Sequence, residues 1–278
     1  MRPQKESEKK MGDQWGDLLA LRVLGESLAD AKKARVSAVN RAERGGVLRE
    51  MERDMITRPA LAVEDEYAHR LVEEYAKVVP DNVRAWAEGI PGLGSGPLFP
   101  RIIAAIGHPR IATPYAWGEV NGKPAVVSAG DPFERSLRQL WQYCGCGDPE
   151  TNPRQDIIGH SPTRDDKLRG GKRTTVRPLL HVFSSYLVRM HTRNEKVASS
   201  RYYAILEETK KEAAENRHVR QCQNKARPPM SPNGCGTFAH PEWGAPGSLW
   251  RPGHINMHAH RIVHKELLRD LWVVSGES

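Results

Sequence analysis

The sequence predicts a mostly α-helical protein: a long N-terminal helix or coiled-coil arm, then a helical domain that contains a helix-hairpin-helix and a small β-hairpin insertion. In several stretches, apolar residues recur at three- and four-residue steps, the period of an amphipathic helix. Proline and glycine separate these stretches, and only one short region has the pattern of paired strands around an Asn-Gly turn. We expect a disordered tail over 1–12, a helical linker or dimerisation arm over 13–80, and a helical domain over 81–274 with insertions near 108–130 and 218–253.

Composition limits the class of protein. The 278 residues suffice for one large domain or two small ones. Lys and Arg number 42 against 34 Asp and Glu, and the net charge of +8 suits a polyanionic partner such as nucleic acid. No apolar run approaches the ~18 residues of a membrane span, and the charged N-terminus lacks the apolar core of a signal peptide. We therefore expect a cytoplasmic protein without a membrane partner.

The N-terminal arm is expected to be a basic helix. From about Asp13 to Met55 an apolar stripe follows the helical period, formed by Leu18, Leu21, Leu24, Leu28, Ala31 and Ala34. The opposite face of this helix is basic, and we expect it to face solvent, with contact to phosphate as the alternative. Its basic residues are Lys32, Lys33, Arg35, Arg41, Arg44 and Arg49. The stripe could equally be a coiled-coil seam that pairs with a second copy or with another segment. Pro59 is expected to end this helix, and a second helix is expected from Val63 to Val79.

The most informative motif runs from Trp86 to Gly96 and is followed by an apolar run to Ile106. Ile-Pro-Gly-Leu-Gly between two helical patterns predicts helix, tight turn, helix. Gly92 and Gly94 permit backbone angles that a Cβ forbids, and they would leave N–H groups bare where the second helix dipole favours an anion. We interpret the motif as a helix-hairpin-helix that contacts nucleic-acid backbone, with an ordinary turn as the alternative. Its candidate contacts are Ile90, Gly92, Leu93, Gly94 and Ser95.

The remaining segments continue the helical pattern. Asp81 is expected to cap the helix before the turn. Asn121-Gly122 predicts a β-hairpin, and Asp131-Pro132 is expected to start a helix that ends at Gly145. A long polar loop follows, and the last helices are expected over 174–190, 199–216 and 254–274.

Several basic residues lie just before and at the start of the helix expected from 174. Several cations at a helix N-terminus suit a phosphate backbone, and the alternative is a solvated basic loop. The Gly-Gly-Lys-Arg-Thr run does not predict a nucleotide-binding loop, because it lacks a glycine at the required offset and a Ser or Thr directly after the lysine. The candidate contacts here are Arg169, Gly171, Lys172, Arg173 and Arg177.

Short segments occur in a distinctive order along the chain: Ile90-Pro91-Gly92-Leu93-Gly94, Ala105-Ile106-Gly107, Leu137-Arg138-Gln139-Leu140, Tyr143-Cys144-Gly145, Arg169-Gly170-Gly171-Lys172-Arg173, Val176-Arg177, Arg201-Tyr202-Tyr203 and His264-Lys265 with Arg269. This order resembles the C-terminal domain of the IS-one-ten type of bacterial insertion-sequence transposases. The resemblance implies DNA as the partner, transposition or recombination as the process, and a nucleoid-associated protein of a bacterium or phage. A structured guide RNA stays open as a second partner.

The resemblance also bears on catalysis. The family's N-terminal RuvC-like DEDD nuclease domain has no room before residue 60, so we expect that half to be missing and the chain not to be catalytic alone. The family's serine nucleophile would correspond to Ser161, with His160 as base and Arg164 and Arg169 holding a phosphate. The alternative is that Ser161 is a turn residue beside Pro162.

No cofactor and no metal site are expected. The cysteines, expected to be reduced, have no standard zinc spacing, although a zinc site stays open at Cys144, Cys146, Cys222 and Cys235. The last helix carries the i,i+4 pairs His254/His258 and His260/His264. Because no carboxylate accompanies these pairs, we expect packing or surface histidines.

Together these observations predict a DNA-binding protein related to insertion-sequence transposases that grips backbone phosphates and forms a homo-oligomer through its N-terminal helix. Two alternatives stay open. The chain could be an active recombinase subunit that uses Ser161 with a partner domain in trans, or a helical adaptor that does not bind nucleic acid.

Overall fold

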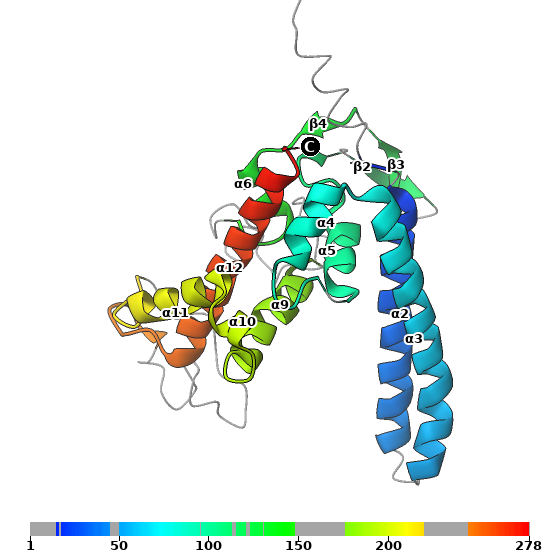
Figure 1. Cartoon of the computed structure of the whole chain (residues 1–278), viewed down its shortest axis with the longest axis horizontal. Coiled ribbons are helices and arrows are strands. Elements are labelled where there is room, and N and C mark those ends of the chain that lie inside the picture. Colours follow the sequence, from blue (N-terminus) through cyan, green and yellow to red (C-terminus); the bar gives the residue numbers. More distant parts are fainter. Residues whose placement is uncertain are drawn as a thin grey trace, which may run out of the picture. The chain divides into compact units, whose positions relative to one another are not determined.

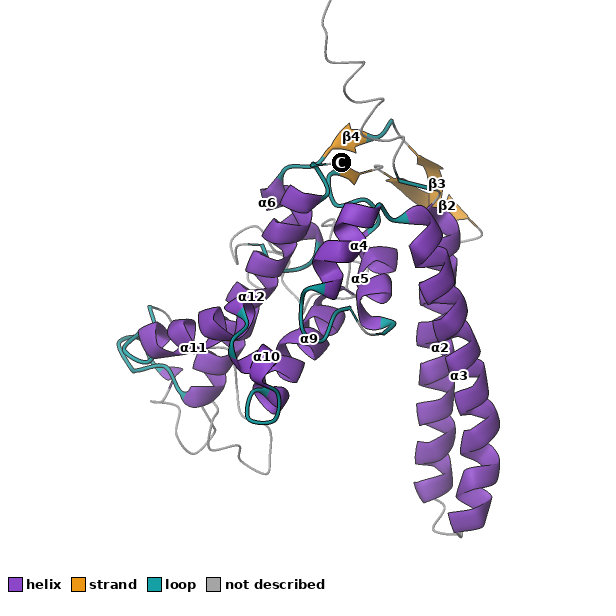
Figure 2. Ribbon diagram, in the orientation of Figure 1, coloured by secondary structure: helices purple, strands orange, loops and turns teal. Residues whose placement is uncertain are grey.

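A computed structural model describes residues 15–16, 18–44, 50–94, 96–112, 115–120, 123–129, 131–147, 176–219 and 244–277. The described chain is mostly α-helical, as predicted (Figures 1 and 2). It divides into two compact units, the first comprising Met1–Leu179 with Leu271–Ser278 and the second Leu180–Asp270. None of the helices in these ranges is long and apolar enough to cross a membrane.

In the ranges given above, the first unit contains helices and two short antiparallel strand pairs. Its helices are α2 (Leu18–Arg44), α3 (Glu50–Val78), α4 (Asp81–Glu88), α5 (Leu98–Ile106) and α6 (Leu137–Tyr143). Strand β1 (Ile111–Ala112) pairs with β4 (Phe133–Glu134), and β2 (Tyr115–Val120) pairs with β3 (Lys123–Ala129).

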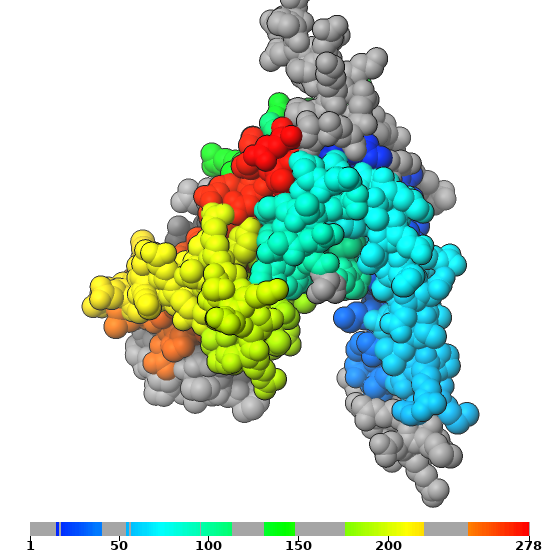
Figure 3. All heavy atoms as spheres, in the orientation of Figure 1, coloured from blue at the N-terminus to red at the C-terminus, as the bar shows by residue number. Residues whose placement is uncertain are grey.

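The N-terminal arm consists of two long helices that lie side by side, α2 and α3 (Figure 1). Leu21 and Leu28 of α2 and Leu71 of α3 are buried, and Arg35 of α2 forms an ion pair with Glu64 of α3. In the space-filling view the side chains of α3 cover much of α2 (Figure 3). Of the two pairings that the apolar stripe allowed, the structure therefore contains the one with another segment of the same chain.

The prediction that Pro59 ends a helix is wrong, because α3 runs through it from Glu50 to Val78. Proline at this position cannot donate a hydrogen bond to the carbonyl of Met55, four residues earlier. Met55 is 73% exposed and Pro59 is also exposed, so water can reach the carbonyl that loses its partner. The packing of α3 against α2 outweighs the local preference of the proline.

Most residues of helix α5 are buried. Its buried residues include Phe99, Ile102, Ile103 and Ile106. It also lies close to α2, since a Cβ built on Gly25 would stand 2.7 Å from the Cβ of Ala104. Pro97 takes the N-cap position and Pro100 the third helical position, where no helical N–H bond is lost.

Two predicted helix starts need correction. Asp81 is the first residue of α4 rather than its cap: Pro80 holds the N-cap position, and Asp81 pairs instead with Arg84. Asp131-Pro132 does not start a helix, because the following Phe133 and Glu134 pair with β1. Helix α6 begins at Leu137 after a capping box, in which the Ser136 hydroxyl accepts from the N–H of Gln139 and the Gln139 side chain accepts from the N–H of Ser136.

Where the structure describes the second unit, it consists of helices: most of α9 (Val176–Met190), then α10 (Glu195–Ala198), α11 (Arg201–Ala213) and most of α12 (Pro252–Val274). Its core residues include Phe183, Leu187, Leu206, Val263 and Leu267. At its surface Arg201 forms ion pairs with Glu266 and Asp270 of α12, and the hydroxyl of Tyr202 donates to Asp270 at 2.8 Å. The two ends of the predicted 218–253 insertion are joined by a backbone hydrogen bond, in which His218 N donates to Ser248 O at 2.9 Å.

Candidate nucleic-acid interface

The connection between α4 and α5 is held by two apolar anchors. Ile90 is 8% exposed and Leu93 is 1% exposed, so both side chains belong to the core. The N–H of Leu93 donates to the carbonyl of Ile90 at 3.1 Å, which closes a tight turn between them. Because both side chains face inward, these two candidate contacts could meet a ligand only through their backbone.

Both glycines of the turn are required by its geometry. Gly92 has φ of 88°, in the left-handed region that side chains rarely adopt. A Cβ on Gly94 would stand 2.5 Å from the Cα of Glu88, so only glycine lets the chain pass this close to the end of α4. The Gly-x-Gly spacing is therefore a packing requirement, and the backbone of Gly94 itself is exposed.

The start of α5 offers backbone donors. The helical hydrogen bond that joins Arg101 N to Pro97 O is 3.0 Å long, and the N–H groups of Leu98 and Phe99 precede the helical ladder. A Cβ on Gly96 would meet no heavy atom within 4 Å. The side of the chain that precedes α5 is thus open to a ligand, and the helix dipole there favours an anion.

Side-chain charge around this turn is mixed. Arg101 of α5 is partly buried, which lowers the pKa of its guanidinium, while the Glu64 carboxylate raises it. Arg84 is paired with Asp81. Glu88, at the end of α4, is exposed and carries a negative charge close to the turn. Any attraction for phosphate at this point therefore comes from backbone N–H groups rather than from a ring of cations.

The second group of candidate contacts can be placed only in part. Arg177 is the second residue of α9 and is half-buried. The other predicted site residues lie outside the described residues, namely Ser95, Ser161, Arg169, Gly171, Lys172 and Arg173.

Two of the four cysteines are described. Cys144 and Cys146 are reduced and fully buried at the end of α6. Burial raises the pKa of the Cys144 thiol well above its usual value, which favours the protonated form over the thiolate that binds metal. Cys222 and Cys235 lie outside the described residues.

The histidines of α12 fall into two groups. His254 stacks on Trp250 with ring centroids 4.3 Å apart, and burial, with His218, His258 and Arg261 nearby, lowers the pKa of His254 to about 4. This geometry fits the predicted packing role.

The second group is a cluster that sequence reasoning missed. His260 and His264 are buried, and their ring nitrogens and those of His181 on α9 lie within 4.8 Å of one another. Burial, with His181 and Lys210 nearby, lowers the pKa of His260 to about 4. The i,i+4 spacing was the available signal, but the third member comes from a helix 79 positions earlier in the chain than His260.

These features define a mostly α-helical protein with a glycine-built turn that exposes backbone at a helix start. Comparison of the chain with models of protein families, with curated proteins and with solved structures finds no match.

Proposed function

We propose that the chain is a DNA-binding protein, related to insertion-sequence transposases, that holds DNA by its backbone phosphates through the α4–α5 turn. The observation that carries the proposal is the turn itself. No residue with a side chain fits at Gly92 or Gly94 without strain, and the backbone of this turn is exposed just before the N-terminus of α5. Contacts of this kind position a duplex without reading its sequence.

The net charge of +8 supplies the long-range part of the interaction. The net charge attracts a polyanion without selecting one part of the surface, whereas the turn would determine where a phosphate binds. In this proposal the chain holds DNA in place, and cutting or joining would require chemistry from another domain or subunit.

The test uses Gly96, because a side chain there enters open space. Binding of a labelled duplex to Gly96→Glu, Gly96→Lys and Gly96→Ala would be measured by fluorescence anisotropy at ~50 mM salt. We expect Glu to weaken and Lys to strengthen binding, by up to about tenfold, with Ala close to wild type. Scrambling the duplex sequence should leave these ratios unchanged.

A salt titration completes the experiment. The logarithm of the affinity should fall against the logarithm of the salt concentration with a slope of about −0.9 per phosphate contacted. Equal affinity in all three Gly96 variants would contradict the placement of the phosphate, and an absence of binding at ~50 mM salt would favour the helical adaptor instead. The recombinase alternative predicts that Ser161→Ala abolishes strand transfer in a reaction reconstituted with the missing domain.

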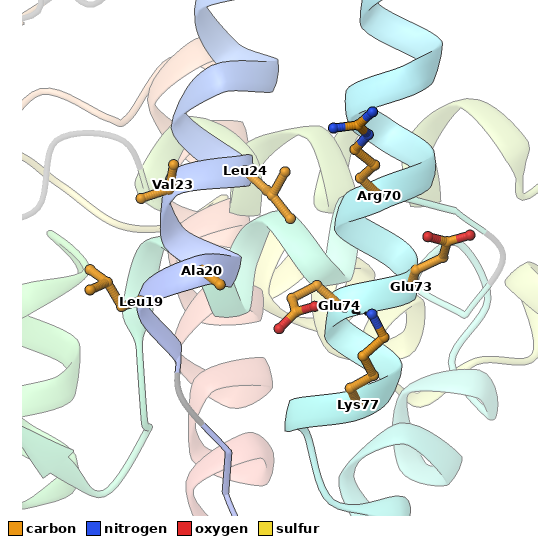
Figure 4. A pocket seen from close by; sticks show the side chains of 8 residues that line it. All are labelled: Leu19, Ala20, Val23, Leu24, Arg70, Glu73, Glu74 and Lys77. Atoms are coloured by element: carbon orange, nitrogen blue, oxygen red, sulfur yellow. Dashed lines mark hydrogen bonds and ion pairs between the residues drawn. The ribbon is translucent and has the colours of Figure 1, made fainter.

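A second copy of the chain is the proposed partner of the N-terminal arm. An open groove of about 700 Å³ runs between α2 and α3, with an apolar wall from α2 and a charged wall from α3 (Figure 4). Leu19 and Val23 of the apolar wall are 64% and 54% exposed and point away from α3, which contributes Arg70 and Lys77 to the charged wall (Figure 4). Exposed apolar residues on one helix beside charges on the next are the arrangement of a helical interface.

A further inference from the structure

Three histidines of the second unit converge from two helices. His181 lies on α9, and His260 and His264 lie on α12, where i,i+4 spacing puts both imidazoles on one face. Their nearest ring nitrogens all fall within 4.8 Å of one another. The ring centroids of His181 and His260 are 4.8 Å apart, and those of His181 and His264 are 6.4 Å apart.

A buried serine sets the orientation of His264. The hydroxyl of Ser184 donates to the carbonyl of His181 at 3.3 Å, and its oxygen lies 2.9 Å from Nε2 of His264. Since the hydroxyl has one proton, Nε2 of His264 is the donor in the second contact, and the lone pair of this imidazole lies on Nδ1. Histidines that bind a metal ion commonly donate a hydrogen bond from one ring nitrogen to an oxygen, while the other ring nitrogen binds the ion. His264 has this arrangement.

His260 provides an independent observation. Its side chain is among the buried polar groups, at 9% exposure, and Nδ1 makes no hydrogen bond with any residue that the structure describes. A buried nitrogen without a partner costs free energy, so it needs an explanation such as an ion. The nearby cation, Lys210, is paired with Glu207 at 2.7 Å, which offsets its charge.

We propose that His181, His260 and His264 bind one divalent transition-metal ion, with Zn²⁺ the expected occupant. Imidazole nitrogens suit zinc, copper, nickel and iron, whereas calcium and magnesium prefer oxygen. Zn–N bonds of about 2.0–2.1 Å place tetrahedral ligands about 3.3 Å apart, so the nitrogens, which now lie within 4.8 Å of one another, would move together by up to about 1.5 Å when the ion binds. Three protein ligands leave a fourth position for water, and the bound ion would tie α9 to α12 within the second unit.

The test is metal binding by the full chain after treatment with a chelator. Titration with ZnCl₂ in a calorimeter should show one ion per chain, and Zn²⁺ should raise the unfolding temperature because it binds only the folded state. His181→Ala removes the least buried of the three ligands, so it is the variant expected to stay folded. Substituting residues around a ligand already costs 10–100-fold in affinity, so losing the ligand should cost more than about 100-fold.

His191→Ala is the matched control. His191 lies one position beyond the end of α9 in the same unit and stacks on Tyr203 at 4.8 Å, away from the cluster. It should bind Zn²⁺ like wild type. Far-UV circular dichroism of each variant verifies that it is folded, and His264→Gln provides a second ligand substitution if His181→Ala is not.

Co²⁺ distinguishes the histidines from cysteines elsewhere in the chain. A tetrahedral cobalt spectrum without a thiolate charge-transfer band is expected for nitrogen and oxygen ligands. A thiolate band, unchanged zinc affinity in His181→Ala, or no binding by wild type would each overturn the proposal. None of these measurements involves DNA, so the metal site and the proposed DNA-binding function can fail separately.

Discussion

His108 is the clearest case of a residue whose environment sets its chemistry. It follows α5, is 9% exposed, and its Nδ1 accepts hydrogen bonds from the N–H groups of Arg110 at 3.0 Å and Ile111 at 3.1 Å. Burial, reinforced by the positive charges of Arg135 and Arg110, lowers its pKa from 6.5 to about 4. The native state therefore holds this imidazole neutral at pH values where the unfolded chain already binds a proton.

This difference predicts acid sensitivity. Because the pKa of His108 is lowered on folding, the unfolded state binds more protons between pH 6.5 and 4, and stability falls as the pH falls through that window. The loss from this group approaches about 3 kcal/mol below pH 4. Denaturant unfolding of wild type and His108→Asn, at a series of pH values, measures it.

Asparagine is the appropriate substitution because its side-chain oxygen can accept the two N–H bonds without titrating. The wild-type stability should decline more steeply than that of His108→Asn. Equal slopes would show that His108 titrates alike in both states. The lowered pKa values of His254 and His260 also make the protein less stable at acid pH. The contribution of His108 is therefore measured by the difference in pH dependence between wild type and His108→Asn.

At the scale of elements, α3 shows tertiary packing prevailing over local preference. Pro59 interrupts the hydrogen-bond ladder, yet the helix continues, with exposed i,i+4 pairs such as Arg58–Asp54 at 3.0 Å and Arg70–Glu66 at 2.6 Å along it. Its buried face, which includes Leu71, is held against α2. The proline is a local cost that this contact offsets.

Removing the proline should therefore stabilise the arm. Pro59→Ala restores the N–H donor to the carbonyl of Met55 and removes the ring clash, a change worth up to about 3 kcal/mol in a helix interior. The unfolding temperature should rise. Pro59→Gly is the control, because it restores the donor but costs about 1 kcal/mol in helix propensity relative to alanine. A drop in stability for both variants would mean that the proline has a packing role in α3.

The elements were predictable where the apolar period was long and uninterrupted. The helices ending at Met190, Ala213 and Val274 fall within a few residues of the expected bounds. The wrong predictions concern Pro59, Asp81 and Asp131, where the local preference of one residue differs from the structure. For α3 and for the residues after Asp131 a partner elsewhere in the fold decided, namely α2 and β1. Asp81 differs, because Pro80 takes the N-cap position and Asp81 pairs with Arg84 of the same helix.

For the whole molecule, the testable consequence of the arm is its oligomeric state. We expect wild type to sediment as a dimer or larger species, because Leu19 and Val23 leave apolar surface on α2 exposed. The double substitution Leu19→Glu with Val23→Glu should shift the protein towards monomer, since it replaces this exposed apolar surface with carboxylates that would repel one another between two copies. Sedimentation velocity over a concentration series measures this.

Val219→Glu is the control, because Val219 is 92% exposed in the second unit. It should leave sedimentation unchanged. A monomeric wild type at all concentrations would refute self-association through the arm, as would an unchanged oligomer in the double variant.

By itself the sequence determined the helical class, the position of most helices and the glycine turn, because these depend on local spacing and on backbone angles that only glycine tolerates. Tertiary structure alone decided that the N-terminal arm folds back on itself, because a stripe of apolar residues does not specify which segment packs against it. It also decided that His181 joins His260 and His264, because the approach of α9 to α12 within one unit depends on core packing. The turn that exposes backbone before α5 was visible in the sequence, whereas the histidine cluster required the fold.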